Sequence, residues 1–451
     1  MSGTLPSGPI NWHRRVWALS GPIILSNLSA PMLGLTDTAV MGHLDSPVYL
    51  GAVAVGTLIV NYLYWSFGFL RMGTTAFTAQ ASGRADALEL RAVLWRGLAV
   101  AGALALLIVL LQWPIFFVGL KLIGASDSVG EAARTFFFIR IWGAPAGLAN
   151  FVLVAWFLGR GQTRTALMLQ VFMNLLNVGL NLLFVLVFDW GVAGVAAGTA
   201  ISETVAVALG LFLILRTLGP AGWAMRGIGV LDPVALRRLF VVNRDIFIRT
   251  LCVVTALAVF TAMGARQGDT FLAANAVLFQ FFTIATFGLD GLAQAAEIMV
   301  GQAMGARDRD SFRRAVVASA LWSFVFALLM TATFAVAGTS IVDGLTTIPE
   351  VRVVAREFLP WAIIIPVACV AAFHLDGVFI GTTRTRAMRN GMLASLAVYL
   401  LALWLLRPEL GNHGLWLSLV LFLGARAFTL AIQYPSLERS VGAERSGGAA
   451  G

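Results

Sequence analysis

Apolar stretches of about 20 residues or more follow one another along almost the whole chain, which is the length that a helix needs to cross a bilayer. The breaks between them carry turn-forming residues, as in Gly159-Arg160-Gly161-Gln162, and no stretch alternates as a strand does. The pattern predicts an all-α polytopic membrane protein. We expect about twelve transmembrane helices, over roughly 16–42, 51–80, 92–119, 133–158, 165–188, 191–216, 240–264, 272–303, 314–338, 354–380, 387–406 and 412–435.

Composition supports this fold class and excludes several functions. Of the 451 residues, 59% are hydrophobic and 12% are charged, which excludes an ordinary soluble domain. The net charge of +9 comes mostly from arginines scattered between apolar runs, so we expect no nucleic-acid partner. Cys252 and Cys369 lie in apolar stretches without metal-ligand spacing. We therefore expect no resident cofactor or metal.

The distribution of basic residues predicts the orientation in the membrane. Arginines such as Arg14, Arg160 and Arg384 fall in connections on one side roughly three times as often as basic residues such as Lys121 fall on the other. Cytoplasmic loops carry the excess of arginine and lysine in membrane proteins. Both termini are therefore expected in the cytoplasm.

The second half of the chain repeats the first at a constant offset of 222 residues. Six helices in each half make the repeat parallel, and two similar bundles around a central cavity are typical of alternating-access transporters. The matching pairs include Met41 and Met263, Gln80 and Gln302, Gly83 and Gly305, and Gly159 and Gly381. The predicted domains are an N-terminal six-helix lobe (1–216), a cytoplasmic inter-lobe linker (217–239), a C-terminal six-helix lobe (240–436) and a disordered tail (437–451).

Polar side chains inside the first, fifth and sixth predicted helices form the first candidate site. Three asparagines recur every three or four residues, so they share one helix face. Counted from the outer helix ends, the most polar positions lie at similar depths, roughly 8 to 18 Å. Hydrogen bonding that only packs helices is the competing interpretation. The expected cluster comprises Asp37, Asn174, Asn177, Asn181, Thr199 and Glu203.

Asp37 is the candidate coupling group, because an ionisable residue in the hydrocarbon is costly and this one has no basic neighbour at its depth. It is a candidate proton switch. Alternatively, Asp37, Asn177, Asn181 and Thr199 supply oxygens for a sodium ion, and composition leaves both interpretations open. The second half lacks this chemistry, because the positions at the offset are Val259, Tyr399, Leu403 and Leu421.

The second half has intramembrane charges of its own. Arg249 and Asp376 lie at similar depths near the cytoplasmic end, so they are expected to pair, with Asp290 a candidate to join them. An inner-gate or stabilising salt bridge and direct ion coupling both fit. In the first half, Arg71 is expected either to snorkel or to pair with Glu203. The predicted C-lobe charge network is Arg249, Asp290, Glu297 and Asp376, with His374 nearby in sequence.

Thioether and aromatic side chains on the first two helices are candidates for the wall of a substrate cavity, because such groups accommodate varied shapes. Ordinary packing is the competing interpretation for most of them. The candidates are Met32, Met41, Tyr62, Tyr64, Phe67, Phe69 and Met72.

Several motifs resemble the multidrug and toxin extrusion (MATE) family, and its DinF-like bacterial branch in particular. They are Thr36-Asp37-Thr38-Ala39-Val40-Met41-Gly42-His43-Leu44, Phe69-Leu70-Arg71-Met72-Gly73, Leu289-Asp290-Gly291 and Leu375-Asp376-Gly377-Val378-Phe379-Ile380-Gly381. The resemblance extends over the chain to about residue 436.

The resemblance implies a two-lobed, twelve-helix exporter of the MOP fold, driven by proton or sodium flow. The family's first-helix carboxylate, fifth-helix asparagine and sixth-helix threonine correspond to Asp37, Asn177 and Thr199. Asn181 replaces an aspartate of several relatives, which weakens the sodium interpretation. Asp376 aligns with the tenth-helix carboxylate of the NorM-like branch, whereas that branch's acidic residue on helix 7 has no counterpart and Arg249 lies nearby.

The predicted function is secondary active multidrug export, in which amphipathic or cationic small molecules are exchanged for protons. Sodium-coupled export and a lipid-linked precursor flippase, which Arg71 and Arg249 would suit, are the alternatives. An intramembrane enzyme is a remote alternative, because the four histidines are dispersed and no nucleophile has a base nearby. No catalytic residue is expected. The protein is expected to act as a monomer in a bacterial cytoplasmic (inner) membrane.

Overall fold

The computed structural model describes residues 11–41, 47–124, 126–219, 229–230 and 232–442. Over residues 30–41 and at residue 47 the description covers the backbone alone. The described part of the chain divides into two compact units. The N-unit lies within Leu25–Phe240, and the C-unit lies within Thr4–Ile24 and Val241–Gly451.

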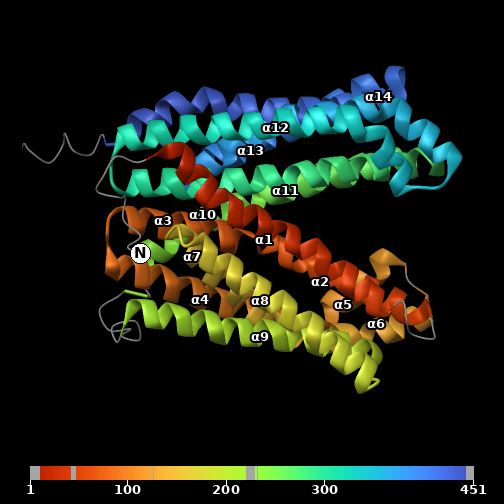
Figure 1. Ribbon diagram of the computed structural model, residues 1–451, viewed down its shortest axis with the longest axis horizontal. Coiled ribbons are helices and arrows are strands. Elements are labelled where there is room, and N and C mark those ends of the chain that lie inside the picture. Colours follow the sequence, from red (N-terminus) through yellow and green to blue (C-terminus); the bar gives the residue numbers. More distant parts are fainter. Residues whose placement is uncertain (1–10, 42–46, 125, 220–228, 231, 443–451) are drawn as a thin grey trace, which may run out of the picture. The chain divides into compact units, whose positions relative to one another are not determined.

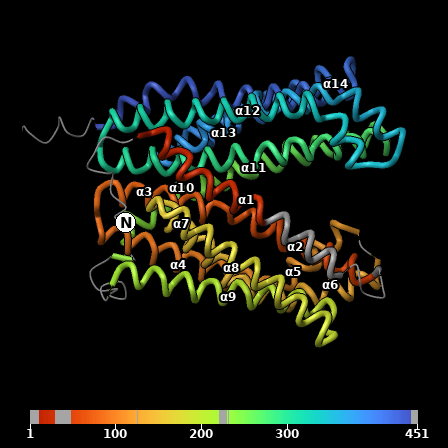
Figure 2. The backbone as a smooth tube through the Cα atoms, in the orientation of Figure 1, coloured from red at the N-terminus to blue at the C-terminus, as the bar shows by residue number. Residues whose placement is uncertain are grey.

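The described residues form helices and contain no strand (Figures 1 and 2). In the N-unit, α3 packs on α7, α8 on α9 and α2 on α6, while in the C-unit α13 packs on α11, α12 and α14. The helices are α1 (Trp12–Met41), α2 (Pro47–Ser66), α3 (Phe69–Gly83), α4 (Ala87–Leu110), α5 (Gln112–Ile123), α6 (Asp127–Arg140), η1 (Ile141–Gly143), α7 (Ala144–Gly159), α8 (Thr163–Leu182), η2 (Leu183–Val187), α9 (Gly191–Leu218), α10 (Pro233–Ala265), α11 (Asp269–Gly305), α12 (Arg309–Leu345), α13 (Pro349–Gly381) and α14 (Thr385–Ser440).

The expected number of membrane spans agrees with these helices. Ten helical segments of the described chain are long and apolar enough to cross a membrane. One of them, α14, has non-helical backbone at Gly411 (φ 56°, ψ −125°) and therefore comprises two helices. With α14 divided there and the 30-residue α1 included, the predicted twelve spans are confirmed.

Two helices extend into segments that the sequence predicted to be the linker and the tail. α10 begins at Pro233, within the segment assigned to the linker, and α14 continues to Ser440, past residue 436. Its residue Leu437 is buried. The remainder of the expected tail, from residue 443, lies outside the described residues.

The repeat predicted from the sequence is present in the backbone. Helices α3 and α11 end at Gly83 and Gly305, and α7 and α13 end at Gly159 and Gly381, each pair 222 residues apart. Left-handed residues recur at the same offset, although few side chains favour that region. The φ angles are 54° and 55° at Ala85 and Arg307, 72° and 57° at Gly161 and Thr383, and 53° and 56° at Asp189 and Gly411.

Capping and close helix crossings are duplicated as well. Asp86 accepts a hydrogen bond from the backbone N–H of Glu89 (2.9 Å) and caps α4, and Asp308 accepts one from Ser311 (3.0 Å) and caps α12. Gly159 lies against the carbonyl of Thr75, and Gly381 lies against that of Glu297, so closely that a Cβ at either glycine would clash. The same two-helix crossing is therefore built in both units.

The first helix of each half begins in the other unit. The start of α1 belongs to the C-unit, where Arg15 donates to Oε1 of Gln302 (2.5 Å). The start of α10 belongs to the N-unit, where Arg238 donates to Oε1 of Gln80 at 3.5 Å. Gln80 and Gln302 are partners at the 222-residue offset. The duplication thus includes the contacts that hold these helix starts.

Candidate functional site

A chain of hydrogen bonds joins α8 to α9 inside the N-unit. Nδ2 of Asn181 donates to Oδ1 of Asn177 (3.1 Å), and Nδ2 of Asn177 donates to Oγ1 of Thr199 (2.9 Å). Thr199 in turn donates to the carbonyl of Val195 (2.9 Å). Asn177 is 1% exposed and Asn181 is fully buried. The structure therefore brings together these three members of the predicted cluster.

Helices α8 and α9 approach each other closely around these hydrogen bonds. A Cβ on Gly198 of α9 would overlap Oδ1 of Asn181, so only glycine fits opposite that amide. Ser202, one turn along α9, adds a longer contact to Nδ2 of Asn177 (3.4 Å). The amides are consequently buried in a narrow contact between the two helices.

Asn174 lies one turn away and has different partners. Its Nδ2 donates to Oγ of Ser29 on α1 (2.9 Å), and its Oδ1 accepts from Gln170 (3.2 Å). The contact with Ser29 brings the N-unit portion of α1 beside α8. The side chains of Asp37, Met32 and Met41 lie outside the described residues, so the predicted roles of these three residues stay predictions.

Glu203, one turn beyond Thr199, is bound by an arginine that the sequence analysis did not single out. Arg140 of α6 donates to Oε1 and Oε2 of Glu203 at 2.6 and 3.0 Å, and also to the hydroxyl of Tyr64 (3.2 Å). Arg140 and Glu203 are 6% and 8% exposed. The guanidinium that binds Glu203 is therefore that of Arg140, not the one suggested from sequence, Arg71. An arginine seven residues inside the predicted apolar span 133–158 was the available signal.

The described candidates for a substrate-cavity wall have different neighbours. Tyr62 is 56% exposed and meets Trp65 edge to face, and Phe67 meets Phe69 edge to face with ring centroids 6.0 Å apart. Tyr64 lies under the guanidinium of Arg140, and Met72 is partly exposed. Their predicted role in substrate binding stays a prediction.

In the C-unit, a buried carboxylate joins two arginines. Asp376 of α13 pairs with Arg249 of α10, as the sequence predicts, and also with Arg426 of α14. Nε of Arg426 adds a contact to Oδ1 of Asp376 at 3.4 Å. Asp376 and Arg426 are each 3% exposed. Arg426 was missed in the sequence, although it too is a single charge inside an apolar span.

The other polar residues of the C-unit have separate partners. Asp290 accepts from Nε2 of Gln294 (2.6 Å) on its own helix, α11. Asp290 also lines one cavity with Arg426. Nε2 of His374 lies 2.9 Å from Oγ of Ser319, and Glu297 is buried at the crossing of α11 and α13. These residues thus have contacts other than those of the Asp376 triad, which comprises Asp376, Arg249 and Arg426.

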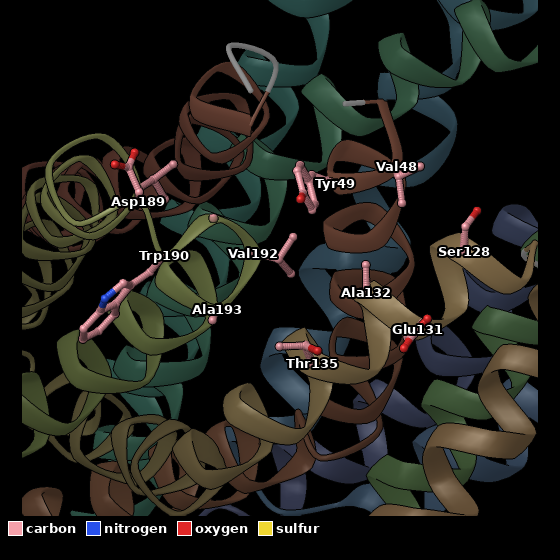
Figure 3. A pocket seen from close by; sticks show the side chains of 12 residues that line it. Val48, Tyr49, Ser128, Glu131, Ala132, Thr135, Asp189, Trp190, Val192 and Ala193 are labelled. Carbon is pink, nitrogen blue, oxygen red and sulfur yellow. The ribbon is translucent and has the colours of Figure 1, made fainter. Parts of the chain in front are cut away.

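A wider cavity of about 490 Å³ lies in the N-unit and is lined by α2, α6, η2 and the start of α9. In Figure 3, Asp189 and Trp190 lie on one side, Ser128 and Glu131 on the other, and Tyr49 between them. The two carboxylates are therefore not directed at a common point. No group of three or more histidine, cysteine, aspartate or glutamate residues suited to a metal ion occurs in the described part of the chain.

Comparison with known proteins agrees with this two-unit architecture. The MatE family model matches residues 22–183 and 246–405, one stretch in each half. DNA damage-inducible protein F of Escherichia coli (strain K12) is 40% identical over 418 residues, which is 93% of this chain and 91% of that one. A probable multidrug resistance protein NorM of Caulobacter vibrioides is 29% identical over 328 residues, with 69% of this chain and 67% of that protein covered.

A solved structure shows the same fold. The Vibrio cholerae MATE transporter VcmN in its bent form superposes with a TM-score of 0.84 at 20% sequence identity, with 95% of this chain and 97% of that one covered. The family match, the relative at 40% identity and the shared fold agree with one another. This chain therefore belongs to the MatE (MATE) family and is a multi-pass membrane transporter, not an enzyme.

Proposed function

We propose that this protein is a secondary active exporter that exchanges protons for amphipathic, cationic small molecules, with Asp37 as the protonation switch. The observation that carries the proposal is the ion pair between Arg140 and Glu203. Because that pair compensates the charge of Glu203, this carboxylate is not an independent coupling group. Among the acidic residues of the predicted cluster, Asp37 is then the one left to titrate.

The helix register supports a place for Asp37 in the same region. Helices α1 and α8 are the first and fifth spans of a chain that crosses back and forth, so they run in the same direction. Ser29 contacts Asn174, and Asp37 and Asn181 follow them by eight and seven residues. At 1.5 Å per residue, both lie roughly 11 Å further along their helices. The backbone of Asp37 is therefore at about the level of the amide chain.

The hydrogen-bond chain favours a proton over sodium. Oδ1 of Asn177 already accepts from Asn181, and Oγ1 of Thr199 already accepts from Asn177. A hard cation needs several oxygens turned toward it, so sodium would compete with these bonds for the orientation of the two side chains. A proton on a carboxyl group needs no such rearrangement.

The lipid-linked precursor flippase has less support. A pyrophosphate group would need arginines that face it, and Arg249 is bound to the carboxylate of Asp376. An anionic substrate would have to displace that carboxylate from a buried site, at a cost of several kcal/mol.

The test is transport of a fluorescent cationic dye by the protein in liposomes, with proton and sodium gradients imposed separately. We expect export under a proton gradient alone and its loss in Asp37→Asn. Asp189→Asn is the matched control, because it removes the same charge from the exposed surface of the N-unit and asparagine tolerates its left-handed backbone. Full proton-driven export by Asp37→Asn, or export driven only by sodium, would contradict the proposal.

We further propose that the protein lies in a bacterial inner membrane as a monomer with both termini in the cytoplasm. The excess of arginine in alternate connections supports this orientation. Cysteines introduced into the Gly159–Gln162 connection are expected to react with an impermeant thiol reagent only from the cytoplasmic side. Labelling from the opposite side would reverse the assignment.

A further inference from the structure

Four arginines of the C-unit gather on α10 and at the start of α14. Nη1 of Arg389 donates to Oδ1 of Asp245 (2.8 Å), and Nη2 of Arg244 donates to the same oxygen (3.0 Å). Arg384 is the N-cap of α14, and Arg386 lies one turn before Arg389 on that helix. These four residues, hereafter the arginine surface, surround a single carboxylate.

Asp245 is the fixed part of this group. Its side chain is fully buried, and the hydroxyl of Thr385 donates to its second oxygen, Oδ2 (3.2 Å). Arg389 also donates to the side-chain oxygen of Asn390, while the side chain of Arg244 is 43% exposed. The buried carboxylate therefore holds two guanidinium groups in place and compensates the charge of one.

The other two arginines are exposed at the beginning of α14. Neither Arg384 nor Arg386 makes a hydrogen bond or an ion pair with any residue that the structure describes. The first turn of α14 contains no acidic side chain. Because the start of a helix carries the positive end of its dipole, arginines there are unfavourable until an anion compensates them. The arginine surface therefore has an excess of positive charge that Asp245 offsets only in part.

Exposed apolar residues continue from the arginine surface along one face of α14. Leu393, Ala397 and Leu400 follow Arg386 by seven, eleven and fourteen residues, which are close to whole turns of a helix. All three are exposed, Leu393 by 46% and Leu400 by 44%. The helix rises roughly 21 Å from Arg386 to Leu400. One leaflet contains about 15 Å of hydrocarbon, so this face is long enough to accompany an acyl chain.

The duplicated scaffold does not require this arrangement. In the first half of the chain, the counterparts of Arg244, Asp245, Arg384 and Arg389 at the 222-residue offset are Pro22, Ile23, Gln162 and Leu167. Arg386 alone has a basic counterpart, Arg164. Orientation in the membrane needs an excess of arginine on one side but no buried carboxylate that holds two arginines together. Neither the common fold nor the orientation accounts for the cluster.

We propose that the arginine surface binds the headgroup of an anionic phospholipid, whose acyl chain lies along α14 from Leu393 to Leu400. Arg386 and Arg389 flank residue 387, where the apolar span predicted from sequence begins, so their guanidinium groups are at headgroup level. Basic pockets at cytoplasmic helix ends bind such headgroups, and a guanidinium donates two hydrogen bonds to one phosphate. The inference is independent of the proposed proton coupling. Only its assignment to the cytoplasmic leaflet rests on the orientation proposed above.

The experiment titrates the delipidated full chain in detergent with phosphatidylglycerol and, separately, with phosphatidylcholine of the same acyl chains. Native mass spectrometry resolves the chain with one bound lipid and gives a Kd for each lipid. We expect phosphatidylglycerol to bind more tightly, because choline compensates the phosphate of the other lipid. Arg386→Gln should weaken phosphatidylglycerol about fivefold, and Arg384→Gln with Arg386→Gln about tenfold or more. Phosphatidylcholine binding should not change in either variant.

Two further variants make the test specific. Arg164→Gln is the matched control, because it removes an exposed arginine from the equivalent turn of α8 and should leave both affinities unchanged. Leu393→Glu keeps all four arginines but places a carboxylate in the path of the acyl chain, so it should weaken both lipids. Equal affinities for the two lipids, full phosphatidylglycerol affinity in the double variant or in Leu393→Glu, or an equal loss in Arg164→Gln would each overturn the proposal. The melting temperature of each variant identifies a folding defect.

A competition experiment distinguishes a lipid from a soluble anion, which offers the same phosphate chemistry. An excess of inorganic phosphate, compared with chloride at equal ionic strength, is expected not to displace phosphatidylglycerol, because the acyl chain contributes to binding. Displacement by phosphate alone would identify a soluble-anion site and overturn the assignment to a lipid. These measurements use no dye and no ion gradient, so their failure leaves the proposed export function to its own test.

Discussion

The two units share one backbone and differ in how they place polarity inside it. In the N-unit, neutral amides and a hydroxyl form a chain between α8 and α9, and the one buried ion pair described there is isolated on α6 and α9. In the C-unit, the positions of Asn177 and Asn181 are Tyr399 and Leu403, and buried carboxylates are bound by arginines, Asp376 by Arg249 and Arg426 and Asp245 by Arg244 and Arg389. The two halves therefore share a scaffold and differ in the polar chemistry that each carries.

This difference indicates a division of labour. The hydrogen-bond chain of the N-unit contains no ionised group, so gain or loss of a proton by a neighbouring carboxyl group would not break an ion pair within it. A carboxylate held by two arginines is costly to change in either direction. We therefore assign coupling to the N-unit and treat the Asp376 triad as a fixed structural element of the C-unit.

Breaking the triad is expected to have the largest effect. Asp376→Asn leaves the guanidinium groups of Arg249 and Arg426 buried without their shared counter-charge, which should cost about 3 to 5 kcal/mol of folding free energy or more. Glu203→Gln leaves only Arg140 uncompensated and should cost less. Reversible unfolding in mixed micelles would measure both variants. A smaller loss for Asp376→Asn than for Glu203→Gln would contradict the comparison.

Breaking the hydrogen-bond chain of the N-unit is expected to cost an intermediate amount of folding free energy, and the equivalent position of the C-unit provides the control. Asn177→Leu removes a buried donor and acceptor and leaves Thr199 and Asn181 without that partner, so we expect a loss of about 1 to 3 kcal/mol. Its counterpart Tyr399 is fully buried, and its hydroxyl has no hydrogen-bond partner among the described residues. Tyr399→Phe should therefore be neutral or slightly stabilising by the same unfolding measurement. Equal losses would show that the two positions do not differ as proposed.

Removal of a helix cap should cost the least folding free energy, and the loss should be similar in the two units. Asp86→Ala and Asp308→Ala each remove one capping bond, which is typically worth about 1 kcal/mol. Similar losses in thermal unfolding would support a shared scaffold. A loss confined to one unit would argue against equivalent roles.

Asp308 also has a pH dependence with a defined sign. Burial disfavours its charged form, but hydrogen bonds from Ser311 outweigh this and hold the pKa of Asp308 below its ordinary value of 3.8. Its contribution to stability is therefore complete above that value and is lost as the pH falls through the lowered pKa. The deficit of Asp308→Ala relative to the wild type should accordingly shrink in acid.

The fold was predictable from sequence because its signals are local or periodic. Apolar length predicts spans, and the 222-residue offset predicts paired helix ends such as Gly159 and Gly381 without any knowledge of contacts. The grouping of Asn177 with Asn181 was equally accessible, because four residues make one turn of a helix.

The salt-bridge partners were harder to predict. Arg140 and Glu203 are 63 residues apart on helices that are not consecutive, and Arg426 and Asp376 are 50 residues apart. Which buried charge meets which depends on helix rotation and packing, which apolar periodicity does not specify in helices that are hydrophobic on every face. The rule that an intramembrane charge needs a partner identifies Arg140 and Arg426 as residues to explain but does not name the partner.

Proton release on ligand binding tests the central claim most directly. If binding of a cation and of a proton at Asp37 oppose each other, adding phenyltrimethylammonium to the purified protein in weakly buffered solution must release protons, by reciprocity of the coupling. We predict measurable release from the wild type and none from Asp37→Asn, with the cation still bound by both. Equal proton release from Asp37→Asn and the wild type would contradict the account.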